Sequence, residues 1–443
     1  MALEWTRCVG FDSSNKLCPP RNFHSSTLVG DYLYIIGGTN SEKFFSDVKK
    51  IQLRDLESGN PMSARWDVAS LRAGESIPTS GGGAFAARSR HTAVAIGSDI
   101  YVFGGVKGGN DLFCLDTAND PLTWKVVKTT GRPPSSRLGH SATAFEDRMF
   151  LFGGTDGIND YNDLYEFSPK TGHWSELANI AGTAPKPSPN YSLHVLRNNL
   201  IVLGGSASDT CMSVFMVNLV GEKRWWELPS FRAPFDPPSC RYLYASTCLS
   251  SVNVSALSKH SGGSKQGGGG NQGSNNGTSA LPPSAITGTG QPYKILVFGG
   301  TIRNKEKKAD DSGASAGLCN ETFVLEFHAD KASATLGATA EYRIKWVKIP
   351  SVGKATTKDA VAEDSRMAEV DNIYWKRTPC PRIGHTMVSF PNLTRKICQA
   401  GGGVNSLNVP VQRVYVFGGS DRKRQFGDLH YADLDVSFTW QIN

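Results

Sequence analysis

Five arginines recur at a fixed place in a repeated motif, and their chemistry suits ligand binding. Each stands first in an Arg-x-x-His motif or a close variant of it; they are Arg21, Arg88, Arg137, Arg241 and Arg382. A guanidinium group is planar, and its paired N–H donors match the two oxygens of a carboxylate. A ring of these groups would suit a partner with an acidic segment. The alternative is structural, because the same arginines could bond carbonyls of neighbouring repeats.

The histidines of the motif invite a second interpretation, as metal ligands. His24, His91 and His140 come from three consecutive repeats, and His385 belongs to a later one. No carboxylate or cysteine accompanies them at a recurring ligand spacing, so packing within the repeat is the favoured interpretation. The chain also lacks a phosphate-binding loop, a Gly-x-Ser-x-Gly elbow and a His-Glu-x-x-His pair. We therefore expect no metal, no cofactor and no catalytic residue.

Two basic runs offer further binding residues. Arg303 opens the run Arg-Asn-Lys-Glu-Lys-Lys, and Arg422 opens the run Arg-Lys-Arg. Both runs fall in loops at the same end of the repeat as the arginine motif, so they could contact the same partner. Acidic neighbours nearly cancel their charge, and a solvated charged rim is the alternative.

A repeat of short strands must position these motifs. An apolar run that ends in a Gly-Gly doublet occurs six times; the doublets begin at Gly37, Gly104, Gly153, Gly204, Gly299 and Gly418. In the first four units the first residue of the arginine motif, or Ser188 in its place, lies 16 residues before the first glycine. Such a fixed spacing indicates one structural unit copied along the chain.

Each unit continues with an alternating apolar segment and then a tryptophan. The tryptophans are Trp66, Trp124, Trp174, Trp225, Trp346 and Trp440. The short apolar segments and turn residues predict four antiparallel strands, a to d, with the arginine motif on strand a and the tryptophan opening strand d. Glycine permits the close backbone approach needed near a central axis, and the tryptophan fills space between neighbouring sheets. Closure of the sheets into a ring removes exposed edges.

The composition limits the function classes. The chain has 443 residues, a net charge of +7 and nine cysteines, an odd number with no Cys-x-x-Cys pair. The mild charge does not predict nucleic-acid binding, and no apolar run is long enough for a membrane span. The first residues lack the pattern of a secretion signal. We expect a cytoplasmic protein, with the nucleus as the alternative, whose cysteines are reduced and mostly buried.

The set Arg-x-Gly-His, apolar run, Gly-Gly, Asn-Asp-Leu-Tyr and Trp resembles the kelch repeat. The units at 88–124, 137–174 and 382–440 match it best, whereas Ser188 and Tyr191 replace Arg and His in the fourth unit. The resemblance implies a six-bladed kelch β-propeller with four antiparallel strands per blade. In a kelch adaptor that grips an acidic loop, arginines at this motif position contact the ligand. No BTB or F-box domain is recognised, so the chain resembles the kelch-only proteins.

We expect a single propeller over residues 1–443, interrupted by insertions. The longest is a Gly-, Ser- and Asn-rich segment at 251–292 in loop a–b of blade five, and its composition predicts a disordered spacer. Blade six carries another insertion at 392–412. Trp5 resembles a further strand-d opening, and we favour closure in which the last blade holds both ends of the chain. The N-terminal strand would either complete that blade or lie outside its own fourth strand.

These observations predict a non-catalytic scaffold or adaptor. A protein partner, with an acidic segment, would dock on the face formed by the b–c and d–a loops. One alternative is a structural subunit of a large intracellular assembly. The other is a propeller enzyme, such as a sugar epimerase or an oxidase, that acts on a small anionic or sugar substrate in the channel mouth.

Overall fold

The protein consists of β-strands and loops throughout the part described by the computed structural model. That part comprises residues 3, 5–8, 11–12, 18–53, 65–68, 71–72, 85–205, 212–229, 237–249, 293–302, 317–329, 342–349, 379–398, 406–421 and 423–435. Every regular element in these ranges is a strand, and they contain no helix suited to crossing a membrane. The all-β class predicted from the sequence is confirmed. The low-complexity insertion at 251–292 lies outside the described residues.

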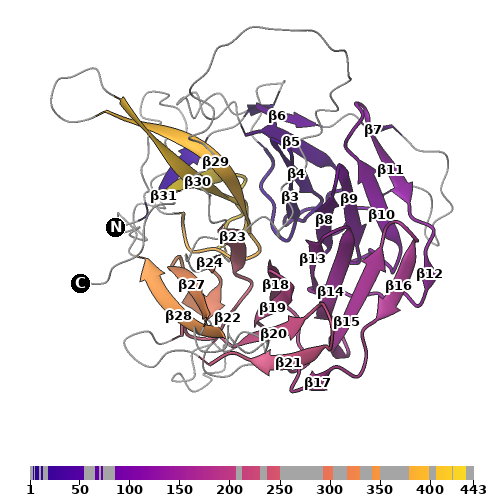
Figure 1. The fold of residues 1–443 in the computed structure, drawn as a ribbon. Coiled ribbons are helices and arrows are strands. Elements are labelled where there is room, and N and C mark those ends of the chain that lie inside the picture. Colours follow the sequence, from indigo (N-terminus) through magenta and orange to yellow (C-terminus); the bar gives the residue numbers. More distant parts are fainter. Residues whose placement is uncertain are drawn as a thin grey trace, which may run out of the picture.

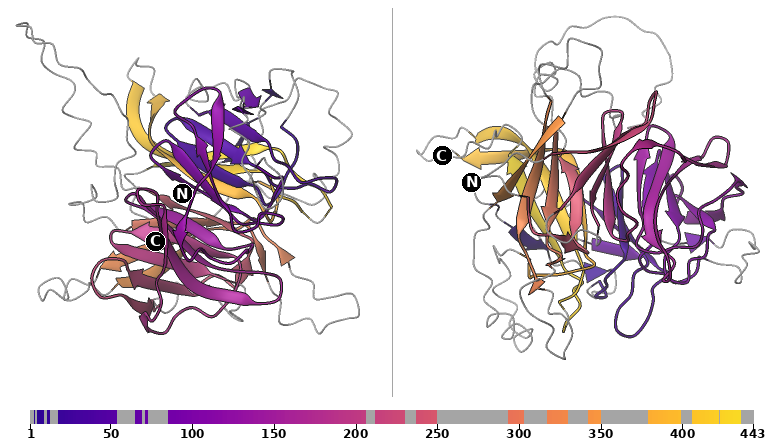
Figure 2. Two further views of the ribbon diagram at one scale, coloured as in Figure 1. Left: turned by 90° about the vertical axis from the view of Figure 1, so that its right-hand side faces the viewer. Right: turned by 90° about the horizontal axis from the view of Figure 1, so that it is seen from below.

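Six sheets of four or five strands surround a central axis (Figures 1 and 2). The innermost strand of each sheet, strand a, directly follows the Arg/His motif or its variant. These strands contact one another in a closed circuit, β3 (Ser25–Val29), β8 (Thr92–Ile96), β13 (Ser141–Phe145), β18 (Tyr191–Leu196), β23 (Ala245–Leu249) and β29 (Thr386–Cys398), which returns to β3. The circuit establishes a propeller, in which each sheet is a blade. The described residues contain six such blades, and the count for the whole chain stays a prediction.

Strands b, c and d follow outward in every blade, and all of them pair antiparallel, as predicted. In blades one to six, in order, strand b is β4 (Tyr32–Ile36), β9 (Asp99–Phe103), β14 (Arg148–Thr155), β19 (Asn199–Gly204), β24 (Tyr293–Phe298) and β30 (Ser406–Phe417). In the same order, strand c is β5 (Val48–Gln52), β10 (Leu112–Asp116), β15 (Asp160–Ser168), β20 (Val214–Asn218), β27 (Thr322–Ala329) and β31 (Leu429–Asp435). In blades one to five strand d is β6 (Arg65–Val68), β11 (Leu122–Val126), β16 (His173–Glu176), β21 (Arg224–Glu227) or β28 (Tyr342–Ile349).

Four blades carry a fifth, two-residue strand on their outer edge. These strands are β2 (Phe11–Asp12), β7 (Leu71–Arg72), β12 (Thr130–Gly131) and β17 (Ala181–Gly182), and each pairs parallel with strand d. Each belongs to the linker that leaves the preceding blade, so the linker ties two blades together. A separate small sheet in blade five joins β22 (Arg241–Tyr242), β25 (Thr301–Ile302) and β26 (Gly317–Leu318).

The N-terminal segment closes the ring. Strand β1 (Trp5–Cys8) pairs antiparallel with β31, with Trp5 opposite Ala432, and so serves as strand d of blade six. This confirms the expectation that the last blade holds both ends of the described chain. Trp440, which the sequence suggested as the start of that strand, lies outside the described residues. Trp5 takes the corresponding place, buried with its ring 5.3 Å from that of Phe298.

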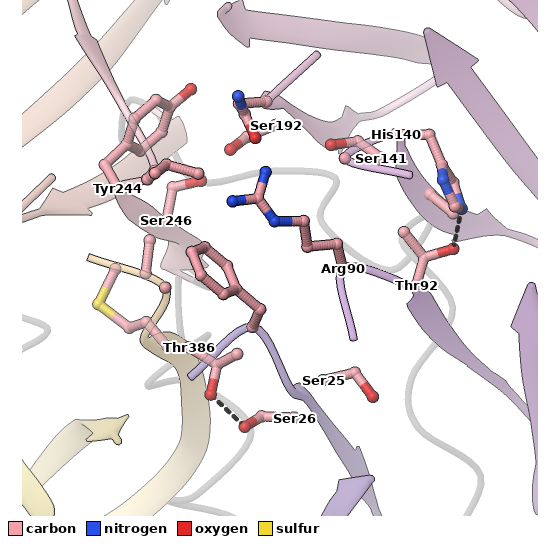
Figure 3. Close-up of a pocket in the computed structure, with 18 of the residues that line it drawn as sticks. Ser25, Ser26, Arg90, Thr92, His140, Ser141, Ser192, Tyr244, Ser246 and Thr386 are labelled. Atoms are coloured by element: carbon pink, nitrogen blue, oxygen red, sulfur yellow. Dashed lines mark hydrogen bonds between the residues drawn. The ribbon is translucent and has the colours of Figure 1, made fainter. Parts of the chain in front are cut away.

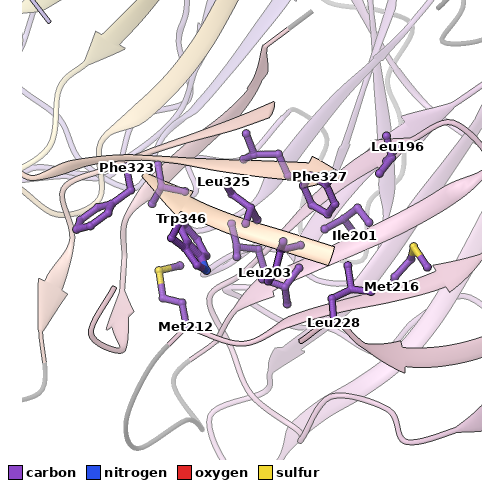
Figure 4. Close-up of a cluster of buried hydrophobic side chains, with 14 of the residues drawn as sticks. Leu196, Ile201, Leu203, Met212, Met216, Leu228, Phe323, Leu325, Phe327 and Trp346 are labelled. Carbon is purple, nitrogen blue, oxygen red and sulfur yellow. The ribbon is translucent and has the colours of Figure 1, made fainter. Parts of the chain in front are cut away.

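The tryptophans fill the spaces between blades, as predicted. Trp66 in blade one lies 5.1 Å from Phe417 of blade six, and Trp174 in blade three lies 5.6 Å from Phe103 of blade two, measured between ring centroids. Figure 4 shows the corresponding cluster between blades four and five, where Trp346 and Phe327 pack near Leu203 and Met216. Burial of these large side chains supplies the main stabilisation between sheets.

The second glycine of each doublet makes the backbone contact between blades. Its N–H donates to the carbonyl of the first motif residue in the next blade in five cases, Gly38 to Arg88, Gly105 to Arg137, Gly154 to Ser188, Gly300 to Arg382 and Gly419 to Arg21, at 2.8–3.3 Å. These glycines adopt φ of +89° to +97°, a conformation that residues with a Cβ rarely reach. The doublet is therefore required by both conformation and space.

Blade six departs from the sequence-based expectation. The segment 392–412 was expected to be an insertion between strands a and b, but β29 continues to Cys398 and β30 starts at Ser406. The two strands therefore form a long hairpin, with a register shift between Phe390 and Leu393. Figure 1 shows the hairpin projecting beyond the other blades. Apolar residues alternate at Leu407, Val409 and Val411, and that pattern is the sequence signal for the extension.

We predict that Gly105→Ala destabilises the fold far more than Gly97→Ala. Both glycines have positive φ, but a Cβ at Gly105 would lie 2.6 Å from the Ser89 carbonyl oxygen, whereas a Cβ at Gly97 meets nothing within 4 Å. We expect a loss of about 1 kcal/mol in unfolding free energy for Gly97→Ala and about 3 kcal/mol or more for Gly105→Ala. Urea denaturation measures both. Equal losses would contradict the close approach between the glycine doublet and the arginine motif within blade two.

Candidate functional site at the mouth of the central channel

The five motif arginines are buried inside their own blades. Their exposed fractions are 0–2% for Arg21, Arg88, Arg137, Arg241 and Arg382. Each donates to the carbonyl of the first doublet glycine of its blade, at 2.8–3.4 Å. Three also pair bidentately with an aspartate at the start of strand c, Asp47, Asp163 or Asp428, at 2.5–3.3 Å. The arginines therefore fasten strands b and c to the motif.

Arg241 and Arg88 vary this arrangement. Arg241 donates to Glu321 at 3.1 Å, on the segment that leads into β27. Arg88 donates to the carbonyls of Gly104 and Gly108, and burial lowers its pKa to about 10 although Asp111 opposes the shift. All five guanidinium groups also lie over aromatic rings of their own blades.

The structure corrects the expected position of these arginines. They were expected to ring the channel mouth, but none of the five lines the channel, because each side chain turns outward into its blade. Their contact with a partner's carboxylates stays a prediction, and such a contact would have to displace the intrablade acid. Arg303 and Arg422 lie outside the described residues.

The motif histidines join neighbouring blades. Nε2 of His24 lies 2.8 Å from Thr386 Oγ1, Nε2 of His91 lies 3.0 Å from Ser25 Oγ, and Nε2 of His140 lies 2.9 Å from Thr92 Oγ1. His385 donates to the carbonyl of Phe298 at 3.2 Å. Burial, together with the nearby motif arginine, lowers the pKa of His91, His140 and His385 to about 3. In the part of the chain described, no cluster of three or more potential metal-ligating side chains occurs.

A ring of left-handed residues surrounds the channel mouth. They occupy the third motif position, Phe23, Arg90, Gly139, Asn190, Leu243 and Gly384, with φ between +52° and +65°. Four consecutive hydrogen bonds between backbone groups run around this ring at 2.7–3.1 Å. They run from Phe23 N to Gly384 O, Arg90 N to Phe23 O, Gly139 N to Arg90 O, and Asn190 N to Gly139 O. Two of the six positions are glycine, so the ring itself needs no side chain. We name these six residues the mouth ring.

The channel behind the mouth ring has a volume of about 300 Å³. Its wall carries hydroxyl groups from all six innermost strands; they belong to Ser25, Ser26, Thr92, Ser141, Ser192, Ser246 and Thr386. Figure 3 shows the Arg90 side chain projecting among them, with its guanidinium on the side of Ser192 and Ser246. Arg90 is half-buried and lies 4.2 Å from the centroid of the Phe23 ring. The wall is thus rich in hydrogen-bond donors around a single cation.

The b–c loop of blade three presents an apolar side chain at the same end of the molecule. Its tip, Ile158, is 92% exposed, and the loop is held by Asp156, whose Oδ1 accepts the N–H groups of Ile158 and Asn159 at 2.8 and 2.7 Å. The N–H of Asn159 and the Tyr161 hydroxyl hold the pKa of Asp156 below its usual range. The base of the loop bridges to the arginine motif through Leu138 and Thr155. The apolar tip and the channel mouth therefore belong to one face.

The sequence reasoning missed Arg90, Phe23 and Ile158. The signal for the first two was present, because the units at 137 and 382 have glycine at the third motif position and the units at 21 and 88 do not. Ile158 could have been noticed as an apolar residue within a loop of Asp, Gly and Asn. Its exposure depends on the tertiary fold.

Comparisons with known proteins agree with this architecture. Residues 65–254 match the model of the KLHDC2/KLHL20/DRC7 Kelch-repeats domain. Acyl-CoA-binding domain-containing protein 6 of Oryza sativa subsp. japonica is 29% identical over 196 residues, which are 43% of this chain and 28% of that protein. The leucine-zipper-like transcriptional regulator 1 homolog of Drosophila melanogaster is 27% identical over 240 residues, which are 52% of this chain and 23% of that protein. The match thus spans about a quarter of the length of each relative.

A solved structure resembles the whole chain. The structure of YjhT aligns with a TM-score of 0.50 and 13% identity, and the alignment covers 93% of this chain and 95% of that one. At this identity the likeness supports the fold alone. The share of the chain that the family model leaves unmatched is therefore consistent with the same propeller.

We predict that Arg137→Ala costs about 3 kcal/mol of unfolding free energy. The change leaves the carbonyl of Gly153 and the Asp163 carboxylate without their buried donor, and breaking a buried pair is strongly destabilising. Arg148→Ala in the same blade is the control, because Arg148 pairs with Glu146 and Glu166 at the surface, and its loss should cost under about 1 kcal/mol. Equal effects in urea denaturation would contradict a structural role for the motif arginine.

We also predict that stability falls between pH 7 and pH 5. The buried histidines stay neutral in the folded chain, with pKa values of about 3, but protonate near pH 6.5 when unfolded. The unfolded state therefore binds more protons below pH 6.5, and stability is lost as the pH falls towards 3. Each such histidine should contribute a loss of up to about 2 kcal/mol at pH 5. Urea denaturation of the protein and of His140→Gln at both pH values tests this; an unchanged pH dependence in the variant would count against the assignment.

Proposed function

Since this chain is a kelch-repeat β-propeller, we propose that it is a non-catalytic scaffold or adaptor whose partner docks on the face formed by the b–c and d–a loops. Kelch-repeat domains typically mediate protein–protein interactions. A fold alone does not assign a function, so the choice of face rests on the residues exposed there. The cytoplasmic location expected from the sequence, with the nucleus as the alternative, stays a prediction.

The observation that carries this proposal is the exposed Ile158 on the face where the channel opens. An isoleucine that is 92% exposed contributes nothing to the core, yet the loop beneath it is fixed by four hydrogen bonds to Asp156. A pre-organised apolar tip loses little conformational freedom on binding and can enter a pocket of a protein partner. The polar channel mouth on the same face adds hydrogen-bond donors. An apolar anchor beside a polar recess suits a protein surface.

The sequence-predicted arginines enter this proposal in two ways. Arg303 and Arg422, which the sequence predicts in b–c loops of the same face, remain proposed contacts for an acidic segment. Arg21, Arg137, Arg241 and Arg382 would reach a partner's carboxylate by exchange with the intrablade acid, and Arg88 by giving up its hydrogen bonds to the carbonyls of Gly104 and Gly108. Their established contacts hold the b–c loops at the face, so these arginines also support binding through the loops.

We predict that Ile158→Asp abolishes partner recovery whereas Val220→Asp does not. Val220 is the matched control, because it is the other exposed large apolar residue among those described, at 50%, and it lies in the c–d loop of blade four on the opposite face. Affinity purification with the wild-type chain and mass spectrometry identifies the partner. Quantitative recovery with each variant, after thermal melts show that both fold, then tests the face. We expect a drop of at least tenfold for Ile158→Asp.

Unchanged recovery with Ile158→Asp would refute the role of this loop. Loss of the partner with Val220→Asp alone would place the docking surface on the opposite face. An equal loss with both variants would point to contacts around the rim and would likewise contradict the proposal.

A further inference from the structure

The first two strands of blade six extend past the rest of the propeller. β29 has 13 residues and β30 has 12, whereas the innermost strands of the other blades have 5 or 6. Beyond the register shift, residues 393–398 of β29 pair with residues 406–411 of β30, but β31 pairs with β30 only from Val411 onward. Residues 393–398 and 406–410 therefore form a two-stranded ribbon, which we name the blade-six ribbon (Figure 1).

Within the described chain, no third strand covers this ribbon. β29 lies at the edge of its four-stranded sheet, and β31, on the other side of β30, ends opposite Val411. A two-stranded hairpin is only marginally stable in water by itself, and its unpaired backbone groups are a template for another strand. The ribbon is therefore suited to receive a further strand.

Pro410 determines which edge of the ribbon can accept that strand. Proline has no N–H, so Pro410 and Thr394, which lie opposite each other, cannot exchange two hydrogen bonds. They form the other kind of antiparallel pair, in which the backbone N–H and C=O groups point away from the partner strand. Along β29 the same then holds for Lys396 and Cys398, so this edge presents an unbroken row of donors and acceptors. The β30 edge lacks the N–H of Pro410, and proline there disfavours a further strand.

The sequence of the ribbon specifies the charge of the added strand. Between Asn392 and Pro410 the chain contains Arg395 and Lys396 and no Asp or Glu. Opposite charges on neighbouring strands stabilise a sheet, whereas like charges destabilise it. A second copy of the ribbon would bring its own basic residues against these two, so pairing between two copies is disfavoured. A segment with acidic side chains is the complementary occupant.

We propose that the β29 edge of the blade-six ribbon binds an acidic, extended segment of a partner protein, which adds to the ribbon as a further β-strand. The backbone groups of Thr394, Lys396 and Cys398 would form the hydrogen-bond ladder and supply the affinity, and the basic pair would select an acidic sequence. The first residues of β29, Thr386 and Met387, line the channel near its mouth, and the ribbon is the far end of the same hairpin. The site is therefore separate from the face formed by the b–c and d–a loops.

The test measures the fluorescence anisotropy of labelled peptides with the whole chain. The probe is a peptide of about eight residues with blocked ends that alternates valine and glutamate, a length typical of a strand. Its controls carry glutamine or lysine in place of glutamate, or have methylated backbone N–H groups. We expect the glutamate peptide to bind at least about fivefold more tightly than the glutamine peptide. The lysine peptide should not bind because of its charge, and the methylated peptide should not bind because it cannot form the ladder.

Thr394→Pro and Asn408→Pro are matched variants of the two edges. Each removes one backbone N–H that points away from the ribbon, from β29 in the first case and from β30 in the second. Thr394→Pro should weaken binding of the glutamate peptide at least about tenfold, whereas Asn408→Pro should leave it within about twofold of the wild type. The double variant Arg395→Glu, Lys396→Glu should prefer the lysine peptide, a gain that misfolding cannot produce. Ile158→Asp should keep peptide binding, which separates this site from the proposed docking face.

Four outcomes would overturn the proposal. Equal binding of the glutamate and lysine peptides by the wild type would contradict selection by charge. Undiminished binding of the methylated peptide would contradict strand addition. Loss of binding in Asn408→Pro but not in Thr394→Pro would place the added strand on β30. Failure of the wild type to bind any of the peptides would show that the edge is not open to a partner; a wild-type dimer in sedimentation that Thr394→Pro dissociates would then identify a second copy as the occupant.

Discussion

The whole propeller depends on one backbone hydrogen bond that is repeated around the ring. In five of the six described blades the second glycine of the doublet brings its N–H within reach of a carbonyl at the start of the next blade. A Cβ on Gly104 or Gly105 would lie 2.6 Å from the carbonyl oxygen of Arg137 or Ser89, so the approach depends on glycine. This contact also positions the side chains that pack between blades. Trp174 of blade three packs on Phe103 of blade two, and His140 of blade three hydrogen-bonds Thr92 of blade two. Each sheet would otherwise leave an apolar face in water, so this short contact determines how the faces meet.

The arginines of one motif lie in different surroundings. The first arginine faces into its blade, where aspartates and backbone carbonyls satisfy nearly all its donors. The third position faces the channel, where the repeat needs no side chain and each blade is free to differ. The recurrent residues therefore build the blades, and the residues that differ between repeats line the channel mouth. For Arg90 this places a charge where the repeat would accept glycine.

The sequence predicted most of the fold because the spacing from motif to doublet is constant in the first four units. The doublets, the tryptophans and the motif spacing located all four strands of each blade, and Trp5 indicated the closing strand. The burial of the arginines was harder to foresee, since it depends on an acid that lies far along the chain. A signal nevertheless exists: Arg21 and Asp47 are 26 residues apart, as are Arg137 and Asp163. Exposure of Ile158 and the direction of Arg90 follow from the three-dimensional arrangement alone.

The pairing of β1 with β31 has a consequence for the order in which the molecule is made. Trp5 meets Ala432 across the last sheet, so β1 is synthesised more than 400 residues before its partner β31. At about 5–20 residues per second, that interval is roughly 20–80 s. Throughout it, blades one to five form while their ring stays open, and inner strands β3 and β23 lack the neighbour that β29 will supply. Synthesis thus passes through a stage in which sheet surface is exposed, and that stage ends when β29 to β31 have been made and paired.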